Sequence, residues 1–440
     1  MNIFALSSGR GPSGIAILRL SGKGTIRIVE IITKKKKLDP KKAILSKFYN
    51  PLNDNLIDEG LLLLFPGPNS FTGDDLAEFH IHGSNAVISC FLKVLSEQPN
   101  CRHAEPGEFT KVAFQNNKID LIEAESIGDL IHSETELQRQ QAIKLVQGRA
   151  SDYYNNLREK LVKSLAHIEA QIDFAEDDLP DNVLKKVNES IKEVYHDIKK
   201  ILDDHKTGEK IRNGFRVSII GAVNAGKSSL LNLLSKRDLA IVSEEEGTTR
   251  DVIEAYLNID GYPVILADTA GIRDSKNDIE KKGILLALNR SKEADLNLIV
   301  IDSSSKQVDT KIKKLINDKC IVVLNKSDIT DLQSHNFEDA VLVSVKENIN
   351  IDKLIRKIKE KLSTKTVTSN NVLVTRERHR EKLNLCLKEI DNFLNKDQHK
   401  DIEIAAEDLR LATRHLGGIV GKVDVEEILD SIFKDFCIGK

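Results

Sequence analysis

The chain has 440 residues, a formal net charge of −3 at pH 7, 40% hydrophobic residues and 30% charged residues. Its length suits about three domains, and its composition is that of an ordinary globular protein. The small net charge excludes a general electrostatic affinity for nucleic acid, so an RNA partner would have to meet local patches.

The cysteines and the apolar runs restrict the class of protein further. Five cysteines are scattered without a C-x-x-C pair, which argues against a disulfide framework and a zinc site. The chain has no run of 18 apolar residues and no signal-peptide pattern, so we expect a cytoplasmic protein without a membrane span. In a reducing compartment we expect four cysteines to be small buried residues: Cys90, Cys101, Cys320 and Cys386.

Residues 1–118 alternate between short β-type runs ("GIAILRL", "GLLLLF", "LAEFHIHG") and a helical run ("AVISCFLKVLSE"). Glycine and proline separate these runs, a pattern typical of a compact α/β domain. The lysine-rich stretch 34–42 is predicted to be a solvated loop.

Residues 119–212 have a different texture, with apolar residues at helical spacing and charges between them. This pattern predicts long amphipathic helices, and the same texture returns in 366–440. Residues 213–365 lie between these two stretches and alternate apolar strands with helices, which favours a mostly parallel sheet. The predicted fold class is therefore multidomain, α/β plus all-α: a front α/β domain, then a helical domain with a Ras-like P-loop domain inserted into it.

The stretch "GAVNAGKSS" satisfies the phosphate-binding pattern G-x-x-x-x-G-K-[ST] through Gly221, Gly226, Lys227 and Ser228. It follows an apolar strand and begins a helix, which is the context that this motif needs. Backbone N–H groups of such a loop surround phosphate oxygens, the lysine reaches the β- and γ-phosphates, and the serine hydroxyl can bind Mg²⁺.

Three later motifs indicate guanine. In "DTAG", Asp268 can join the Mg²⁺ shell and the Gly271 N–H can meet the γ-phosphate. In "NKSD" at 325–328, the Asp328 carboxylate can accept both N–H donors of the guanine edge, whereas adenine would leave a buried group unpaired. The backbone of "SVK" at 344–346 can meet the guanine carbonyl. Together the motifs predict a GTP hydrolase.

Two parts of that machinery are not evident from the motifs. Ile272 follows the DTAG glycine, where Ras-like enzymes have the glutamine that orients water. A polar group must replace it, and the residues leave three candidates: Asp274, Asp278 and Glu280. Positive charge at the phosphates could come from one of two arginines or from a cation bound by the P-loop amide: Arg250, Arg273 and Asn224.

The C-terminal stretch "FCIGK" has the cysteine spacing of a prenylation box, with Cys437 fourth from the end. Gly439 is not aliphatic and Lys440 is not a usual final residue, which disfavours lipidation. The end of a helix and a catalytic tail remain as alternatives.

Taken together, "GRGPSGIAILRLSG", "FTGDDLAEFHIHG", "AEPGEFTKVAFQNNKIDLIEAESIGDLI", "GAVNAGKSS", "EEGTTRDVIE", "DTAGIRD", "NKSD" and "FCIGK" resemble the MnmE (TrmE) family of tRNA modification GTPases. The resemblance extends from about residue 3 to residue 440. It implies four segments: a tetrahydrofolate-binding and dimerisation domain at 1–118, a helical domain at 119–212 and 366–440, and the G domain at 213–365. It also implies a homodimer that works with the flavoprotein MnmG on C5 of the wobble uridine of certain tRNAs, using GTP, Mg²⁺, K⁺ and 5-formyl- or 5,10-methylene-tetrahydrofolate.

The resemblance also implies roles for single residues. Catalytic roles go to Glu280, which would orient water, and to Cys437, whose thiolate would serve uridine chemistry unless it is only packed at a helix end. Mg²⁺ would be bound by Ser228 and Thr249. K⁺ would be bound by Asn224, Ser243, Glu245 and Thr248. Folate would be bound by Arg19, Glu78, Lys118 and Lys440. The GTP-binding positions would be Asn224, Ala225, Gly226, Lys227, Ser228, Ser229, Ser243, Glu244, Glu245, Glu246, Gly247, Thr248, Thr249, Asp268, Thr269, Ala270, Gly271, Asn325, Lys326, Asp328, Ser344, Val345 and Lys346.

A regulatory GTPase switch, for example in ribosome assembly, is the alternative interpretation. The G-domain motifs do not separate the two, because both need the same nucleotide chemistry. The first 118 residues and the tail distinguish the tRNA-modifying enzyme from the regulatory GTPase, since a binding switch needs neither a folate site nor a terminal cysteine.

Overall fold

The structure is a computed structural model that describes residues 1–9, 11–173, 183–222, 224–236, 254–268, 291–305, 310–329, 337, 339–366, 373–397, 401–423, 429, 432–433, 436 and 439. Contacts divide the chain into two compact units. Unit 1 comprises Met1–Gly128, Val146–Glu159 and Thr413–Lys440, and unit 2 comprises Asp129–Leu145 and Lys160–Ala412.

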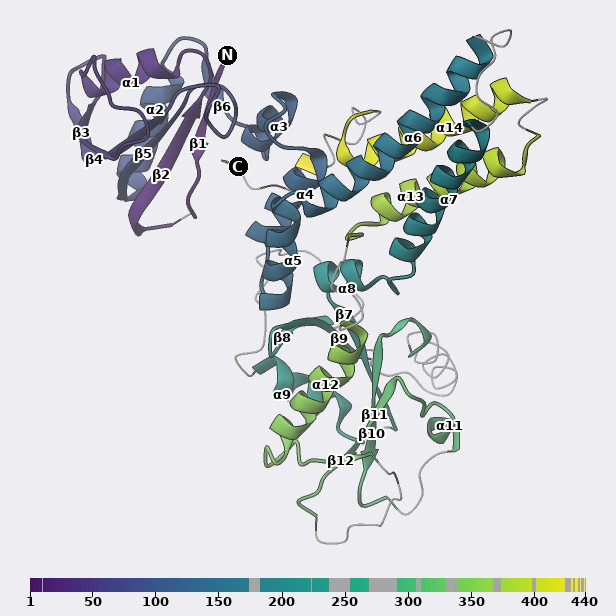
Figure 1. Ribbon diagram of the computed structural model, residues 1–440. Helices are drawn as coiled ribbons and strands as arrows, with labels where there is room; N and C mark the ends of the chain where they lie inside the picture. Colours follow the sequence, from purple (N-terminus) through teal and green to yellow (C-terminus); the bar gives the residue numbers. More distant parts are fainter. Residues whose placement is uncertain are drawn as a thin grey trace, which may run out of the picture. The chain divides into compact units, whose positions relative to one another are not determined.

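Unit 1 is built on a six-stranded sheet of order β3-β4-β5-β2-β1-β6 (Figure 1). Neighbouring strands are antiparallel, except that β1 and β6 run parallel. The strands are β1 (Asn2–Leu6), β2 (Ser13–Ser21), β3 (Ile44–Tyr49), β4 (Leu56–Phe65), β5 (Leu76–Gly83) and β6 (Cys101–His103). The α/β character predicted for this part of the chain is confirmed.

Helices α1 (Thr25–Thr33) and α2 (Asn85–Ser96) pack on one face of this sheet and share its apolar core. Phe48, Phe79 and Phe91 form the centre of that core, with ring centroids 4.9 to 5.5 Å apart. Successive side chains of a strand point to opposite faces. Since Phe79 points into the core, Glu78 points to the other face.

The other part of unit 1 is helical and contains the end of the chain. Helices α3 (Glu108–Gln115) and α4 (Leu121–Ile131) follow the sheet. Phe433 and Phe436 pack with residues of α4 in a small buried cluster. An added Cβ at Gly107 or Gly128 would touch these phenylalanines, so the tail needs small residues where it crosses the two helices.

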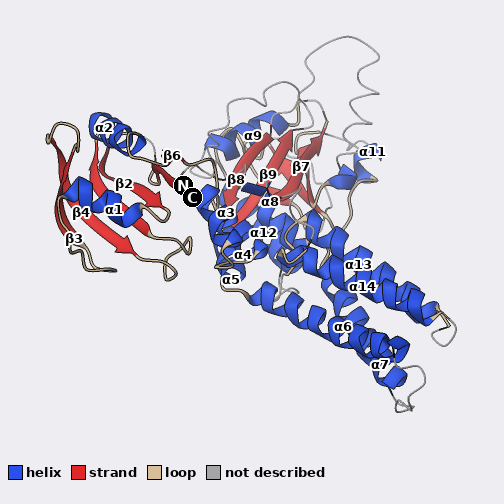
Figure 2. Ribbon diagram, turned by 90° about the horizontal axis from the view of Figure 1, so that it is seen from above, coloured by secondary structure: helices blue, strands red, loops and turns tan. Residues whose placement is uncertain are grey.

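The helices of unit 2 are amphipathic, as predicted. Figure 1 shows α7 (Val183–Leu202) beside α13 (Glu377–Asn395), and Figure 2 shows both among the long helices coloured blue. The buried face of α7 consists of Val187, Ile191, Val194 and Ile198, at helical spacing. The remaining helices outside the second sheet are α5 (Glu136–Val146), α6 (Arg149–Asp173), α8 (Thr207–Asn213) and α14 (Ile402–Val420), of which α6 and α14 have residues in both units. Among the described residues, no helix combines the length and the apolar character needed to cross a membrane.

The second sheet has six strands in the order β12-β11-β10-β7-β9-β8 and is parallel except for β8. Helices α9 (Lys227–Lys236) and α12 (Ile351–Thr366) join the core on one face, and apolar residues around α11 (Thr310–Lys313) pack on the other. The strands are β7 (Phe215–Gly221), β8 (Glu254–Ile259), β9 (Tyr262–Asp268), β10 (Leu296–Asp302), β11 (Cys320–Asn325) and β12 (Val341–Leu342).

One expectation about a cysteine is wrong, and four strands were not predicted: β1, β3, β6 and β8. Cys90 is exposed, because it lies off the stripe of α2 that Ile88, Phe91 and Leu95 bury. Cys101 is half-buried, whereas Cys320 and Cys386 are buried as expected. Of these four, β8 pairs antiparallel with β9 at the edge of the second sheet. The four-segment division of the chain stays a prediction.

A buried arginine ties α8 to α13 in unit 2. The Arg380 guanidinium donates to Glu209 Oε1 at 2.8 Å and to Asp204 Oδ1 at 2.7 Å. Burial alone would lower the pKa of Arg380, but the two carboxylates outweigh that effect and raise the pKa above its ordinary range. The helix that precedes β7 is therefore attached to the helical domain by a shielded ion pair.

We expect Arg380→Met to lower the free energy of unfolding by about 3–5 kcal/mol, because it leaves carboxylates buried without their counter-charge. Urea denaturation followed by circular dichroism measures the loss. Arg410→Met is the matched control: Arg410 also bridges two carboxylates, Glu169 and Glu407, but its side chain is 54% exposed. The control should cost less than about 1 kcal/mol, and equal losses in the two variants would contradict the prediction.

Candidate functional site

The phosphate-binding loop joins the end of β7 to the start of α9. Gly226 has φ +96°, and an added Cβ there would collide with the side-chain amide of Asn325. Only glycine satisfies both the left-handed backbone and this close approach. Asn224 is exposed and also left-handed, with φ +63°. Lys227 Nζ donates to the Ala222 carbonyl at 2.8 Å, so the ammonium lies over the loop.

Asn325, at the end of β11, connects the loop to the predicted base-binding motifs. Its side-chain amide donates to the Ala225 carbonyl at 2.9 Å, and its Oδ1 accepts from the Val345 N–H at 3.1 Å. Its own carbonyl accepts from Ser303 Oγ at 2.6 Å. The residue is only 3% exposed. One buried asparagine thus brings "GAVNAGKSS", "NKSD" and "SVK" together at one edge of the sheet.

Asp328 is exposed at the same edge and is oriented by the third motif. Ser344 Oγ donates to Asp328 Oδ1 at 2.5 Å, and the same hydroxyl accepts from the Glu347 N–H at 3.1 Å. The hydrogen bond from Ser344 is the main reason that the pKa of Asp328 lies below its ordinary value of 3.8. The carboxylate is therefore ionised at neutral pH, as an acceptor for two guanine N–H donors must be.

Lys326 has a partner that the motifs did not reveal. Its Nζ donates to Asp302 Oδ2 at 2.6 Å, and Asp302 is the last residue of β10. Burial would raise the pKa of Asp302, but hydrogen bonds from Lys326 and Ser304 lower it below 3.8. The position of Asp302 at the carboxyl end of a parallel strand is the sequence signal that could have identified it.

Part of the predicted nucleotide site lies outside the described residues. For Asp268 only the backbone is described, at the end of β9. The other predicted positions without a description are Ser243, Glu244, Glu245, Glu246, Gly247, Thr248, Thr249, Thr269, Ala270, Gly271 and Glu280, together with Asp274, Asp278, Arg250 and Arg273.

A second polar site lies on the face of the first sheet that is opposite the phenylalanine core. Arg19 on β2 and Glu78 on β5 are cross-strand partners. Arg19 donates to Glu78 Oε1 through Nη2 at 2.7 Å and through Nε at 3.2 Å. The guanidinium also lies 5.9 Å from the Phe71 ring centroid and 5.7 Å from that of Phe109. The two aromatic rings were not predicted, and no spacing in the sequence relates them to Arg19.

The end of the chain returns to this site. The Gly439 carbonyl accepts from Ser7 Oγ at 2.9 Å and, at 3.4 Å, from Arg19 Nη1. Gly439 has φ +97°, and an added Cβ would crowd the Leu6 carbonyl, so the penultimate position requires glycine. Cys437 and Lys440 lie outside the described residues, but Phe436 and Gly439 are buried.

Lys118 contacts the loop that contributes Phe71 to the Arg19–Glu78 site. Its Nζ donates to the Pro68 carbonyl at 2.9 Å, on the loop that also carries Phe71. His82, two residues beyond His80 on β5, pairs with Asp58 at 2.8 Å. Among the described residues, no group of three His, Cys, Asp or Glu side chains could hold a metal ion.

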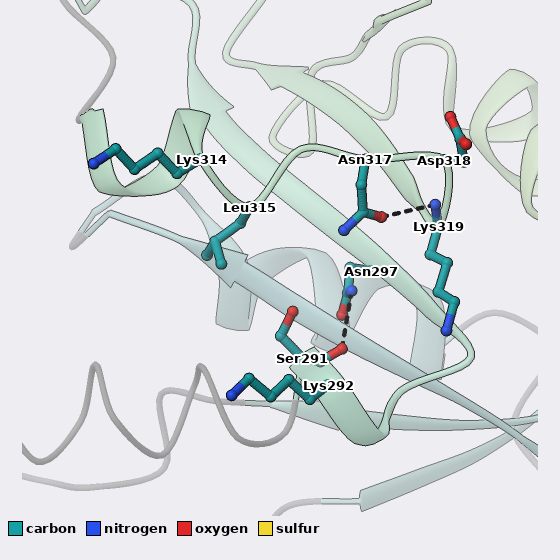
Figure 3. Close-up of a pocket in the computed structure, with 8 residues that line it drawn as sticks. All are labelled: Ser291, Lys292, Asn297, Lys314, Leu315, Asn317, Asp318 and Lys319. Atoms are coloured by element: carbon teal, nitrogen blue, oxygen red, sulfur yellow. Dashed lines mark hydrogen bonds between the residues drawn. The ribbon is translucent and has the colours of Figure 1, made fainter.

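A cavity of about 480 Å³ lies elsewhere in unit 2, at the start of β10 and β11 (Figure 3). Asn297 and Ser291 face it, joined by a hydrogen bond of 3.2 Å. Since the P-loop follows the carboxyl end of the parallel strand β7, this cavity is at the opposite edge of the sheet and is not part of the nucleotide site.

The phosphate-binding loop joins a strand to a helix, and Asn325 connects this loop to the motifs that hold the ionised Asp328. These features are those of a P-loop protein that hydrolyses GTP. Comparison with known families narrows the class. Residues 2–118 match the family model "GTP-binding protein TrmE N-terminus", and residues 121–437 match "MnmE helical domain". The chain belongs to the MnmE family of tRNA modification GTPases.

Curated relatives cover the full length. A protein of Pelagibacter ubique (strain HTCC1062) named "tRNA modification GTPase MnmE" is 58% identical over 444 residues, 100% of both chains. Proteins with the same name from Rickettsia bellii (strain RML369-C) and Paramagnetospirillum magneticum are each 42% identical, over 100% of this chain and 99% of theirs.

We expect Asp328→Asn to exchange guanine for xanthine specificity. The amide oxygen still accepts from N1–H, but the amide NH₂ then faces the guanine amino group as donor to donor and would pair instead with the 2-carbonyl of xanthine. Affinity for fluorescent GDP should fall about 100-fold while affinity for the XDP analogue rises. Glu347→Gln removes a neighbouring exposed carboxylate and should alter neither. Unchanged GDP affinity in Asp328→Asn would exclude Asp328 from the base site.

Proposed function

We propose that this chain hydrolyses GTP in the course of adding an aminomethyl or carboxymethylaminomethyl group to C5 of the wobble uridine of certain tRNAs. The flavoprotein MnmG would be its partner, and tetrahydrofolate would provide the one-carbon unit. The observation that carries the proposal is the combination, in one chain of this family, of a guanine-nucleotide site and a separate polar site at Arg19 and Glu78 that the C-terminal tail reaches.

In the nucleotide half of the reaction, the P-loop amides and Lys227 would hold the phosphates, and Ser228 and Thr249 would hold Mg²⁺. Asn224 would hold K⁺ together with Ser243, Glu245 and Thr248. The exposed position of the Asn224 side chain at the rim of the loop is compatible with this role. A monovalent cation beside the phosphates supplies the positive charge that an arginine finger supplies in related enzymes. Glu280 would orient the attacking water.

In the one-carbon half, folate would bind at Arg19, Glu78, Lys118 and Lys440. The site has what such a ligand needs: a guanidinium for a carboxylate, a carboxylate oxygen for ring N–H groups, and aromatic rings beside them. Cys437 would provide a thiolate for the uridine, two residues before the buried Gly439.

We also propose the assembly and the arrangement that the family resemblance implies. The protein would be a cytoplasmic homodimer through its first domain, and the domains would span 1–118, 119–212 with 366–440, and 213–365. The exposed apolar side chains of Leu45 and Leu61, on neighbouring strands of the first sheet, support a contact surface there. A regulatory switch would have no need of the Arg19–Glu78 site, which favours the enzyme.

Cells that lack this chain should contain tRNA without the C5-substituted wobble uridine. Mass spectrometry of nucleosides from digested tRNA measures the change, and a plasmid copy of the wild-type gene should restore the modified nucleoside. An Arg19→Met copy should restore it poorly, although its GTP hydrolysis stays normal. A deletion strain with unaltered wobble nucleosides would favour the regulatory switch.

Potassium should accelerate GTP hydrolysis at least about tenfold over sodium at equal ionic strength, because a dehydrated cation beside the phosphates stabilises the charge that develops in transfer. Phosphate release measured in the two chloride salts tests this. In Asn224→Ala the difference should shrink while GDP affinity changes little. Equal wild-type rates in the two salts would remove the cation role of Asn224.

A further inference from the structure

His80 on β5 has a buried ring nitrogen for which the described part of the chain offers no hydrogen-bond partner. Its Nε2 is shielded from solvent and, among the residues that the structure describes, accepts and donates no hydrogen bond. Buried polar groups in native proteins are nearly always paired, so an unpaired one needs an explanation. The alternation of β5 puts His80 on the same face as Glu78, away from the phenylalanine core that holds Phe79.

Next to that atom is the second oxygen of the Glu78 carboxylate. Glu78 Oε1 is occupied by two N–H groups of Arg19, whereas Glu78 Oε2 lies 3.7 Å from His80 Nε2. That separation is too long for a hydrogen bond. The carboxylate favours the imidazole tautomer with its hydrogen on Nε2. The two side chains therefore place an acceptor and a donor side by side, and neither has a hydrogen-bond partner among the residues that the structure describes.

We propose that His80 is a further ligand-binding side chain of the Arg19–Glu78 site and selects the cyclic amide edge of a pterin ring. This inference rests on the proposed folate function. Glu78 Oε2 accepts the ring N3–H, and His80 Nε2–H donates to the adjacent C4 carbonyl. The acceptor of Glu78 and the donor of His80 therefore match a ring edge that carries an N–H next to a C=O. They do not match a ring edge on which the donor and the acceptor have changed places.

His82 shows that the feature is specific to His80. It lies on the same strand, but its ring is 72% exposed and its Nδ1 is paired with Asp58 at 2.8 Å. A purely structural histidine would be expected to have such a partner. His82 is therefore the matched control, because it has the same chemistry two residues away and a completed hydrogen bond.

The first test measures binding of 5-formyl-tetrahydrofolate to the full-length protein by calorimetry. His80→Leu should weaken binding about tenfold, because the ligand loses one hydrogen-bond partner. His80→Gln retains an N–H donor and should stay within about threefold of the wild type. His82→Leu should bind as the wild type does.

Stability separates a ligand contact from a packing role. Since His80 Nε2 has no partner to lose, His80→Leu should not lower the melting temperature of the ligand-free protein. A lower melting temperature together with equally weakened binding of every ligand would mean that His80 is structural, which would overturn the inference.

The preference for one pterin ring edge over another tests the role of His80 more directly than affinity or stability does. Folic acid and aminopterin differ at C4, where an amino group replaces the carbonyl and exchanges the donor and acceptor positions of the edge. The wild type should prefer folic acid, and His80→Leu should reduce that preference at least about tenfold. An unchanged preference would overturn the role of His80 and leave the folate site intact. If the wild type bound neither 5-formyl-tetrahydrofolate nor folic acid, the proposed folate function would fail first, and this inference with it.

Discussion

The nucleotide site depends on the hydrogen bonds of one buried side-chain amide. Asn325 donates to the P-loop at Ala225 and accepts from the backbone of Val345, and its own carbonyl holds Ser303. Because an amide has a donor and an acceptor on one planar group, it can fix two loops at once. Phosphate recognition and base recognition are thereby held at a constant separation, as a rigid nucleotide requires. The glycine at 226 follows from the same contact, since a larger residue would displace the amide.

In the site of unit 1, the residues are brought together by the register of the sheet and not by a buried side chain such as Asn325. Arg19 and Glu78 lie opposite each other on antiparallel strands, so their side chains meet on one face. Arg19 contacts one oxygen of Glu78 and the aromatic rings, and the other oxygen of Glu78 lies 3.7 Å from His80 Nε2. The tail adds the Gly439 carbonyl to this group. A chain terminus thus becomes part of a site formed mainly by the first strands.

Strands and helices were predicted correctly where a local sequence pattern reflects the physical reason for which the element forms. Apolar runs correctly predicted β2, β4, β5 and β7, since a strand buried on one or both faces needs such a run. Among the strands that were not predicted, β8 has the sequence "EAYLNI", a weak pattern for a strand, and it is stabilised at the edge of the sheet by pairing with β9. Cys90 was misjudged because residue type alone does not show which face of a helix is buried.

From the sequence alone, the class of nucleotide, the order of the domains and the family were already determined, because phosphate loops and guanine motifs are contiguous and their chemistry is local. Only the tertiary structure decided which distant residues meet. Arg19 reaches Gly439 across 420 positions of sequence, and Asn325 reaches Ala225 across 100. The unpaired nitrogen of His80 belongs to the same category. A side chain lacks a partner only with respect to everything packed around it, and packing is a property of the folded chain that no local pattern encodes.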